Sequence, residues 1–172
     1  QNYVKANVLS PLGIESMQIG GTRLESQAEN EVRYYHPGTA QSVFADDLRE
    51  TVPSPYGAWY LEAMDSHGGW IASAEDLAKF AAAFDDPDQC PILSRQSIEW
   101  MYRRPPGLAG HDEDGSEKPV YYSLGWSNRI VGNDRVNHWH TGSLPGTATI
   151  LIRRHDGKNF VALLNTRVSP ST

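Results

Sequence analysis

Four short segments near the C-terminal end of the chain have the residue pattern of β-strands, and they constrain the fold more than any other feature. They comprise residues 121–130, 136–141, 147–153 and 159–166, where polar and apolar side chains alternate or apolar side chains follow one another, as in strands. We expect the segments that begin at Val136, Thr147 and Asn159 to form one antiparallel sheet in sequential order.

The last two of these strands are joined by Asp156-Gly157, which predicts a tight hairpin with a type I′ turn, because both central positions of that turn need a positive φ. Both strands contain continuous apolar runs, at residues 150–152 and 160–164. Such runs are typical of strands that are buried on both faces. Helices are therefore expected to cover at least one face of the sheet.

Two helices are predicted before the sheet. The first begins at Ser73, whose hydroxyl can accept the free N–H of Asp76. The second is predicted from Ser94 to about Arg104, where Pro105-Pro106 ends it. An apolar stripe with helical spacing predicts that the first helix packs on the sheet; it consists of Leu77, Phe80, Ala81 and Phe84.

The remaining segments lack a sustained apolar period. Residues 2–9 have a short helical pattern that Pro11 and Gly13 end, residues 18–58 are expected to be loop with short strands, and residues 107–119 are predicted to be an exposed, acid-rich loop.

The 172 residues fit one domain, with a helical and loop region at 1–120 and antiparallel strands at 121–167. The net charge of −6 disfavours binding of nucleic acid or anionic lipid, which need a basic surface. No apolar run approaches the roughly 20 residues that span a bilayer. Cys90 is the only cysteine, so it can form neither an internal disulfide nor a cysteine-based zinc cluster.

A polar strand motif, His140-Thr141-Gly142-Ser143, leads into Leu144-Pro145-Gly146. Together with Gly-Gly-Trp-Ile-Ala-Ser-Ala-Glu-Asp-Leu-Ala-Lys-Phe at residues 68–80, it resembles the serine β-lactamase and penicillin-binding-protein family, in its class C β-lactamase, D-amino-acid peptidase and esterase branches. The resemblance implies an α+β fold: part of the β-lactamase/transpeptidase-like fold, in which C-terminal antiparallel strands are flanked by helices.

In that family a Lys- or His-Thr/Ser-Gly strand forms one wall of the active site. The resemblance therefore implies catalytic positions at His140, Thr141 and Gly142 and a substrate-binding position at Ser143, whose N–H can form half of an oxyanion hole. On a strand, His140 and Gly142 share one face and Thr141 points to the other. An imidazole that titrates near neutrality would make the positive charge at this position depend on pH.

Two other motifs of the family do not occur in these 172 residues. No serine has a lysine three positions later, so the Ser-x-x-Lys nucleophile is missing, and neither Tyr-x-Asn nor Ser-x-Asn is present. Residues 3–14 resemble the segment that follows the second motif, and residues 161–167 resemble the last strand. We therefore expect the chain to be the C-terminal part of a longer serine hydrolase, inactive by itself. The alternative is a non-catalytic peptide- or glycan-binding domain derived from the same fold.

His138 and His140 form a His-x-His pair, a spacing found in metal sites, but a third ligand is not evident and no metal is predicted. A Ser143–His140 nucleophile is rejected, because neighbours on one strand rarely form the required hydrogen bond. Trp139 is expected to face the covering helices, and packing roles are expected for Trp70 and Trp126 and structural roles for Tyr121 and Tyr122; Trp59 is left open between packing and a substrate cleft.

The expected partner is a small-molecule or peptide-like substrate, without a cofactor. An apolar, unpaired edge on the last strand predicts self-association between chains. The family resemblance implies an extracytoplasmic or periplasmic location.

Overall fold

A five-stranded antiparallel sheet dominates the molecule, and its strands follow the order of the sequence, β5-β6-β7-β8-β9. The computed structural model describes residues 1–46, 48–133 and 135–167. The strands span β5 Val120–Tyr122, β6 Ser127–Ile130, β7 Val136–Leu144, β8 Thr147–Arg153 and β9 Asn159–Leu164. The expected antiparallel order is thus confirmed.

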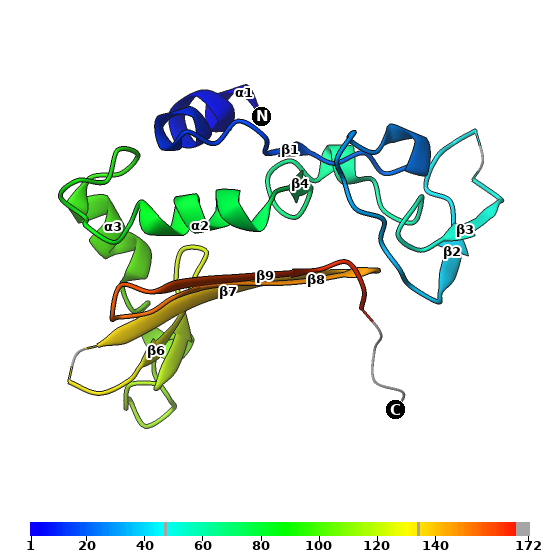
Figure 1. Ribbon diagram of the computed structural model, residues 1–172. Helices are drawn as coiled ribbons and strands as arrows, with labels where there is room; N and C mark the ends of the chain where they lie inside the picture. The colour runs from blue at the N-terminus through cyan, green and yellow to red at the C-terminus, as the bar shows by residue number, and fades with distance from the viewer. Residues whose placement is uncertain (47, 134, 168–172) are drawn as a thin grey trace.

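Helix α2, Ala74–Ala82, lies across one face of this sheet and contacts β8 and β9 (Figure 1). Its start matches the sequence prediction: the Ser73 hydroxyl accepts from the Asp76 N–H at 3.0 Å, and the Asp76 carboxylate accepts in return. Ala81, within the helix, and Phe84, just after its end, are buried together with Leu151 of β8. Three of the four predicted stripe residues, Phe80, Ala81 and Phe84, therefore belong to the core.

Helix α3, Arg95–Tyr102, follows and adds Ile98 to the same core. It ends two residues before the predicted Arg104, because Arg103 already has an extended backbone. The Arg104 guanidinium instead donates to the carbonyls of Gly110 and Lys118, at 2.8 and 2.7 Å, and so ties the 107–119 loop to the end of the helix.

The N-terminal segment lies on the side of α2 away from the sheet (Figure 1). Its helical turns run from Asn2 through Leu12 and end at Gly13, which has a φ of 64°; Pro11 lies inside the last turn instead of stopping it. Leu9 and Ile14 are buried. The short elements of this half are α1 Asn2–Val4, η1 Lys5–Leu9, η2 Ser10–Leu12, β1 Gln18–Ile19, η3 Leu24–Ser26, β2 Thr39–Gln41, β3 Thr51–Pro53, η4 Leu61–Ala63 and β4 Trp70–Ile71.

Residues 18–58 are mostly loop with short strands, as predicted: β2 and β3 pair with each other, and β1 pairs with β4, which lies beyond this segment. This loop region meets one end of the main sheet. The Tyr35 N–H donates to the Asn165 carbonyl at 2.9 Å, and Gly146, in the β7–β8 turn, lies against Tyr34 and Pro55. The loop thus packs against the turn that follows the His-Thr-Gly-Ser motif.

Three sequence expectations about the strands were wrong in detail. Residues 121–130 form a hairpin, β5 and β6, instead of one strand, because the chain turns at Gly125 with a φ of 85°. The turn between β8 and β9 has a positive φ at Gly157 but not at Asp156, so it is not type I′. It closes instead through an N–H of Gly157 that donates to the Arg154 carbonyl.

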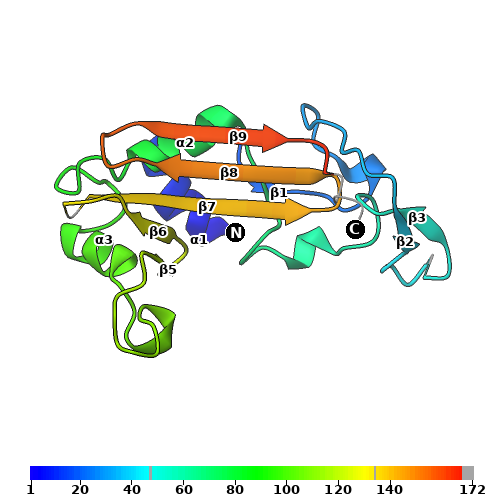
Figure 2. The same cartoon turned by 90° about the horizontal axis from the view of Figure 1, so that it is seen from below.

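The third correction concerns burial. The apolar run of β9 is not buried on both faces: Phe160 and Leu164 are 51% and 55% exposed, while Val161 and Leu163 between them face α2. Figure 2, viewed from below, shows β7, β8 and β9 with no described helix in front of them. Within the described residues, helices therefore cover one face of the sheet only.

The described helices are all too short or too polar to cross a membrane.

Candidate active-site strand

Strand β7 has two halves that differ in how many neighbours they have. Residues 136–139 pair with β6, whose register ends at Ser127 opposite Trp139. Residues 138–144 pair with β8 on the other side. The half that carries the motif, residues 140–144, therefore has β8 as its only ladder partner among the described strands. Its second edge is free, so its main-chain N–H and C=O groups on that side are available to another extended chain.

The register confirms which side chains share a face. His140 lies opposite Leu151 and Gly142 opposite Thr149, on the face that α2 covers, whereas Thr141 lies opposite Ile150 on the other face. Trp139 lies opposite Ile152, so it belongs to the uncovered face with Thr141. The expectation that Trp139 faces the helices was therefore wrong.

The His140 ring is exposed and is held by the turn between β5 and β6. Its Nδ1 lies 2.7 Å from the carbonyl oxygen of Gly125. The Tyr122 hydroxyl lies 3.5 Å from the same nitrogen, and the two ring centroids are 6.3 Å apart. The turn thus places one main-chain acceptor and one phenol beside the first residue of the motif.

The structural role expected for Tyr121 is confirmed, because it is buried and donates its hydroxyl to the Tyr102 carbonyl at 3.1 Å. Tyr122, for which the same role is expected from the sequence, is instead 53% exposed and flanks His140. The glycine in Tyr122-Ser-Leu-Gly-Trp is the sequence feature that could have indicated a turn after Tyr122. A positive φ at Gly125 folds β6 back on β5 and so brings the Tyr122 ring near His140, a placement that cannot be derived from spacing alone.

Gly142 allows the two strands of the motif hairpin to approach. A Cβ atom at this position would lie 2.4 Å from the Thr149 Oγ1 on β8, far inside normal contact. The hydroxyls of Thr141 and Ser143 are exposed and make no hydrogen bond to any described residue. Both remain free to contact a ligand.

His138, two residues earlier on the same face, is part of the packing. Its ring stacks on Tyr102 with the centroids 3.8 Å apart, and its Nδ1 lies 2.7 Å from the Asn128 Oδ1. Burial, with a smaller contribution from the positive charge of Arg153, lowers the pKa of His138 to about 4. The His-x-His pair is thus divided between a neutral, half-buried ring and an exposed one. Among the described residues, no three His, Cys, Asp or Glu side chains lie together as a metal site.

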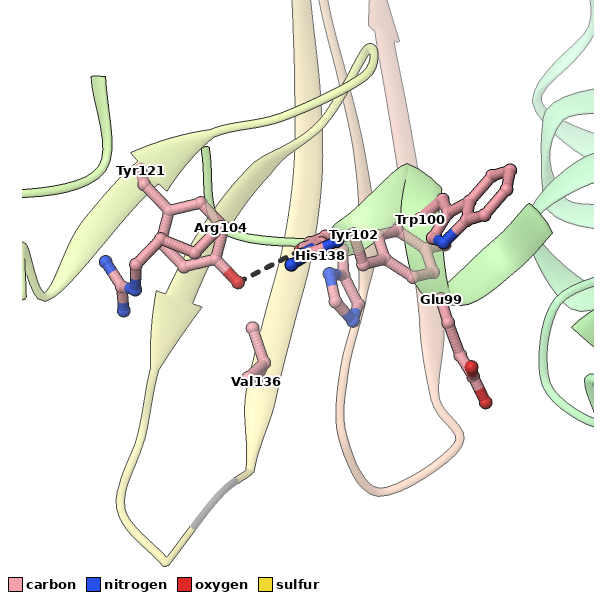
Figure 3. Close-up of a pocket in the computed structure, with 8 residues that line it drawn as sticks. Glu99, Trp100, Tyr102, Arg104, Tyr121, Val136 and His138 are labelled. Carbon is pink, nitrogen blue, oxygen red and sulfur yellow. Dashed lines mark hydrogen bonds between the residues drawn. The ribbon is translucent and has the colours of Figure 1, made fainter. Parts of the chain in front are cut away.

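A hollow of about 480 Å³ lies at the other half of β7, away from the motif (Figure 3). Two of its polar side chains are already engaged: the Tyr121 hydroxyl donates to the Tyr102 carbonyl, and the Arg104 guanidinium stacks 4.2 Å above the Tyr121 ring while it donates to the loop carbonyls. The lining residues are Glu99, Trp100, Tyr102, Arg103, Arg104, Tyr121, Val136 and His138.

The tryptophans differ in environment. Trp126 is 5% exposed and packs edge-on to Phe84 and Tyr102, which confirms its packing role. Trp70 is half-buried and donates its indole N–H to the Asp65 carbonyl at 2.7 Å, again a packing role. Trp59 is 46% exposed.

Comparison with known protein families matches residues 1–172 to the family described as Beta-lactamase. The chain belongs to this family.

Two solved structures share the fold. An octameric penicillin-binding protein homologue from Pyrococcus abyssi superimposes with a TM-score of 0.59 at 23% identity, over 96% of this chain and 33% of its own. A D-stereospecific amidohydrolase from Streptomyces sp. gives a TM-score of 0.58 at 19% identity, over 96% of this chain and 43% of its own. The chain thus spans less than half the length of either protein.

One curated sequence also matches. It is named pyrophosphate–fructose 6-phosphate 1-phosphotransferase, from Amycolatopsis methanolica, and is 41% identical over 59 residues, which cover 34% of this chain and 17% of that protein. A match of that extent supports no statement about activity. The Beta-lactamase family and the α+β, β-lactamase/transpeptidase-like fold predicted from the motif are confirmed.

Proposed function

We propose that this Beta-lactamase family domain supplies the strand wall of a serine hydrolase active site that transfers acyl groups from peptide-like, β-lactam or ester substrates. The observation that supports the proposal is the free edge of residues 140–144, which exposes main-chain hydrogen-bonding groups beside an exposed imidazole. An extended substrate can add to such an edge as a further strand.

The groups at this edge suit acyl transfer. The Ser143 N–H is the expected donor to the oxygen that gains negative charge when a carbonyl is attacked. Protonated His140, at the start of the free half, suits a substrate carboxylate, because a charge-assisted hydrogen bond is stronger than a neutral one. Gly142 adds no side chain that would hinder approach to the strand.

The nucleophile in this proposal comes from outside the 172 residues. A serine acts as a nucleophile only when a base or a lowered pKa activates it, and no Ser-x-x-Lys occurs here. The domain then corresponds to the C-terminal part of a longer hydrolase. This view is supported by the coverage of the two structural relatives: the chain matches only 33% and 43% of their lengths, and one of them is described as an amidohydrolase.

Turnover measurements test the proposal. A chromogenic cephalosporin, a fluorescent penicillin and p-nitrophenyl esters should remain intact with the 172-residue chain, and at least one should react with the complete gene product. In the latter, His140→Ala should lower kcat/KM by about ten- to a hundredfold, as for loss of one charge-assisted hydrogen bond to the substrate carboxylate. His155→Ala removes an exposed histidine in the β8–β9 turn and serves as the control. Covalent labelling of any serine in the 172-residue chain would contradict the proposal.

The rival function is a peptide- or glycan-binding domain without catalysis. The same free edge favours it, since strand addition needs no nucleophile. The sequence of the complete gene product separates the two: Ser-x-x-Lys followed by Tyr-x-Asn or Ser-x-Asn supports the hydrolase, and loss of both supports the binder.

Self-association is proposed as a property of the 172-residue chain. Strand β9 is the last strand of the described sheet, and Phe160 and Leu164 beside its outer edge are exposed. The related Pyrococcus abyssi protein is described as octameric. Light scattering should show association that Leu164→Lys abolishes, because a charge at a sheet edge opposes pairing. A monomer at every concentration would refute it.

A further inference from the structure

We infer that the turn at residues 122–126 fixes the tautomer of His140: the Gly125 carbonyl keeps the ring proton on Nδ1 and leaves Nε2 as the nitrogen that meets a ligand. Gly125 is thereby a positioning residue for the free half of β7. The tautomer itself follows from the geometry, and its use by a ligand rests on the proposed function.

The proton position follows from the chemistry of the two atoms. A main-chain carbonyl oxygen only accepts hydrogen bonds, and it lies 2.7 Å from the His140 Nδ1. A lone pair on Nδ1 would face a second lone pair at that distance. In the neutral ring the proton must therefore reside on Nδ1, and Nε2 carries the lone pair.

The other ring nitrogen is free. No described residue bonds to the His140 Nε2, and the side chain is exposed. Protonation of the ring adds a proton to Nε2 without disturbing the bond to Gly125. The ring thus keeps one orientation in both charge states, and Nε2 presents either an acceptor or a charged donor to the same position.

The position of the Gly125 carbonyl oxygen beside His140 depends on the backbone conformation of Gly125. Its φ of 85° lies in the left-handed region, which most residues avoid, yet a Cβ there would meet no atom within 4 Å. Glycine is therefore required at position 125 by its backbone conformation and not by a lack of space for a side chain. Asparagine tolerates this region and valine does not.

The Tyr122 hydroxyl is a weaker candidate for the same role. Its distance of 3.5 Å to Nδ1 is at the limit for a hydrogen bond, and the single Nδ1 proton already points at Gly125. Tyr122→Phe is therefore the control that separates the phenol from the carbonyl.

Nitrogen-15 NMR of the histidine rings in the ligand-free 172-residue chain tests the inference without any need for activity. Neutral His140 should show a protonated Nδ1 and an unprotonated Nε2, and this pattern should persist in Tyr122→Phe and Gly125→Asn. In Gly125→Val the Nδ1–H tautomer should lose population to the Nε2–H tautomer, which an unconstrained neutral histidine side chain favours. His138, whose Nδ1 faces the Asn128 Oδ1, is the internal reference and should not change.

A wild-type His140 with its proton on Nε2 would overturn the inference. So would an unchanged pattern in a folded Gly125→Val chain, as judged by an unchanged His138. If Gly125→Val shifts the tautomer but leaves binding of an N-acetylated D-alanyl-D-alanine peptide unaltered, the positioning role is refuted. Failure of the wild-type chain to bind that peptide, with the tautomer as expected, would instead count against the proposed function.

Discussion

Each half of strand β7 carries a histidine, but the two histidines lie in opposite environments. Residues 136–139 pair with β6, and His138 and Trp139 pair with β8 as well; there His138 is half-buried, stacked on Tyr102 and held neutral. Residues 140–144 pair with β8 alone, and there the His140 ring is exposed beside a free edge. The pairing with β6 ends opposite Trp139, and this point separates the packed half of β7 from the half with the proposed functional role.

Arg153 should contribute the largest stability difference. It is 7% exposed, lies opposite His138 on β8, and donates to the Ala81 carbonyl, the Tyr102 hydroxyl and the Asp85 carboxylate at 2.7–2.9 Å. Arg153→Met should lower the free energy of unfolding by about 3–5 kcal/mol, because it leaves buried acceptors without their donor. Urea denaturation measures it.

The adjacent arginine provides the control for that change. Arg154 pairs with Asp156 at 2.9 Å on the surface, so Arg154→Met should cost less than about 1 kcal/mol. Equal losses at the two positions would show that the buried network around His138 does not stabilise this half of the strand.

The pH dependence of stability should report on His138. Its pKa is about 4 in the folded chain and roughly 6.5 when unfolded, so the unfolded state binds the proton first as the pH falls. The contribution is fully present above pH roughly 6.5 and is lost progressively toward pH about 4, by at most about 3 kcal/mol.

His138→Asn removes this titration while it keeps a donor near the Asn128 Oδ1. Its free energy of unfolding should fall less steeply than that of the wild type between these pH values. Parallel curves for the two proteins would mean that His138 is not held neutral by burial.

His140→Ala should change stability least. An exposed side chain on the free half contributes little to the core, so the free energy of unfolding should stay within about 0.5 kcal/mol of the wild type. Thermal unfolding measures this. A loss of 2 kcal/mol or more would assign His140 to the packing, like His138, and remove the contrast between the two halves.

The sequence predicted the features that depend on local periodicity and on the motif. The Ser73 cap, the stripe through Ala81 and Phe84, and the order of the last strands follow from side-chain spacing. The family followed from the residues around His140 and the match at residues 68–80.

Features that depend on contacts between distant segments could not be predicted. The turn at Gly125 looks like a strand interior in the sequence, because its neighbours are aromatic and apolar, and only its φ shows the hairpin. The exposure of Phe160 could not be derived either, since an apolar run does not reveal how many faces are covered. The placement of Tyr122 beside His140 depends on the same hairpin.

The most direct test of the account is an NMR titration of the 172-residue chain with an N-acetylated D-alanyl-D-alanine peptide, with the L,L isomer as the comparison. The account predicts amide shifts concentrated at residues 140–144 and at the Gly125 turn, little change at residues 136–139, and loss of the shifts in His140→Ala. Shifts centred on the hollow beside Trp100 and His138, or no shifts at millimolar peptide, would contradict the claim that the free half of β7 is the functional strand.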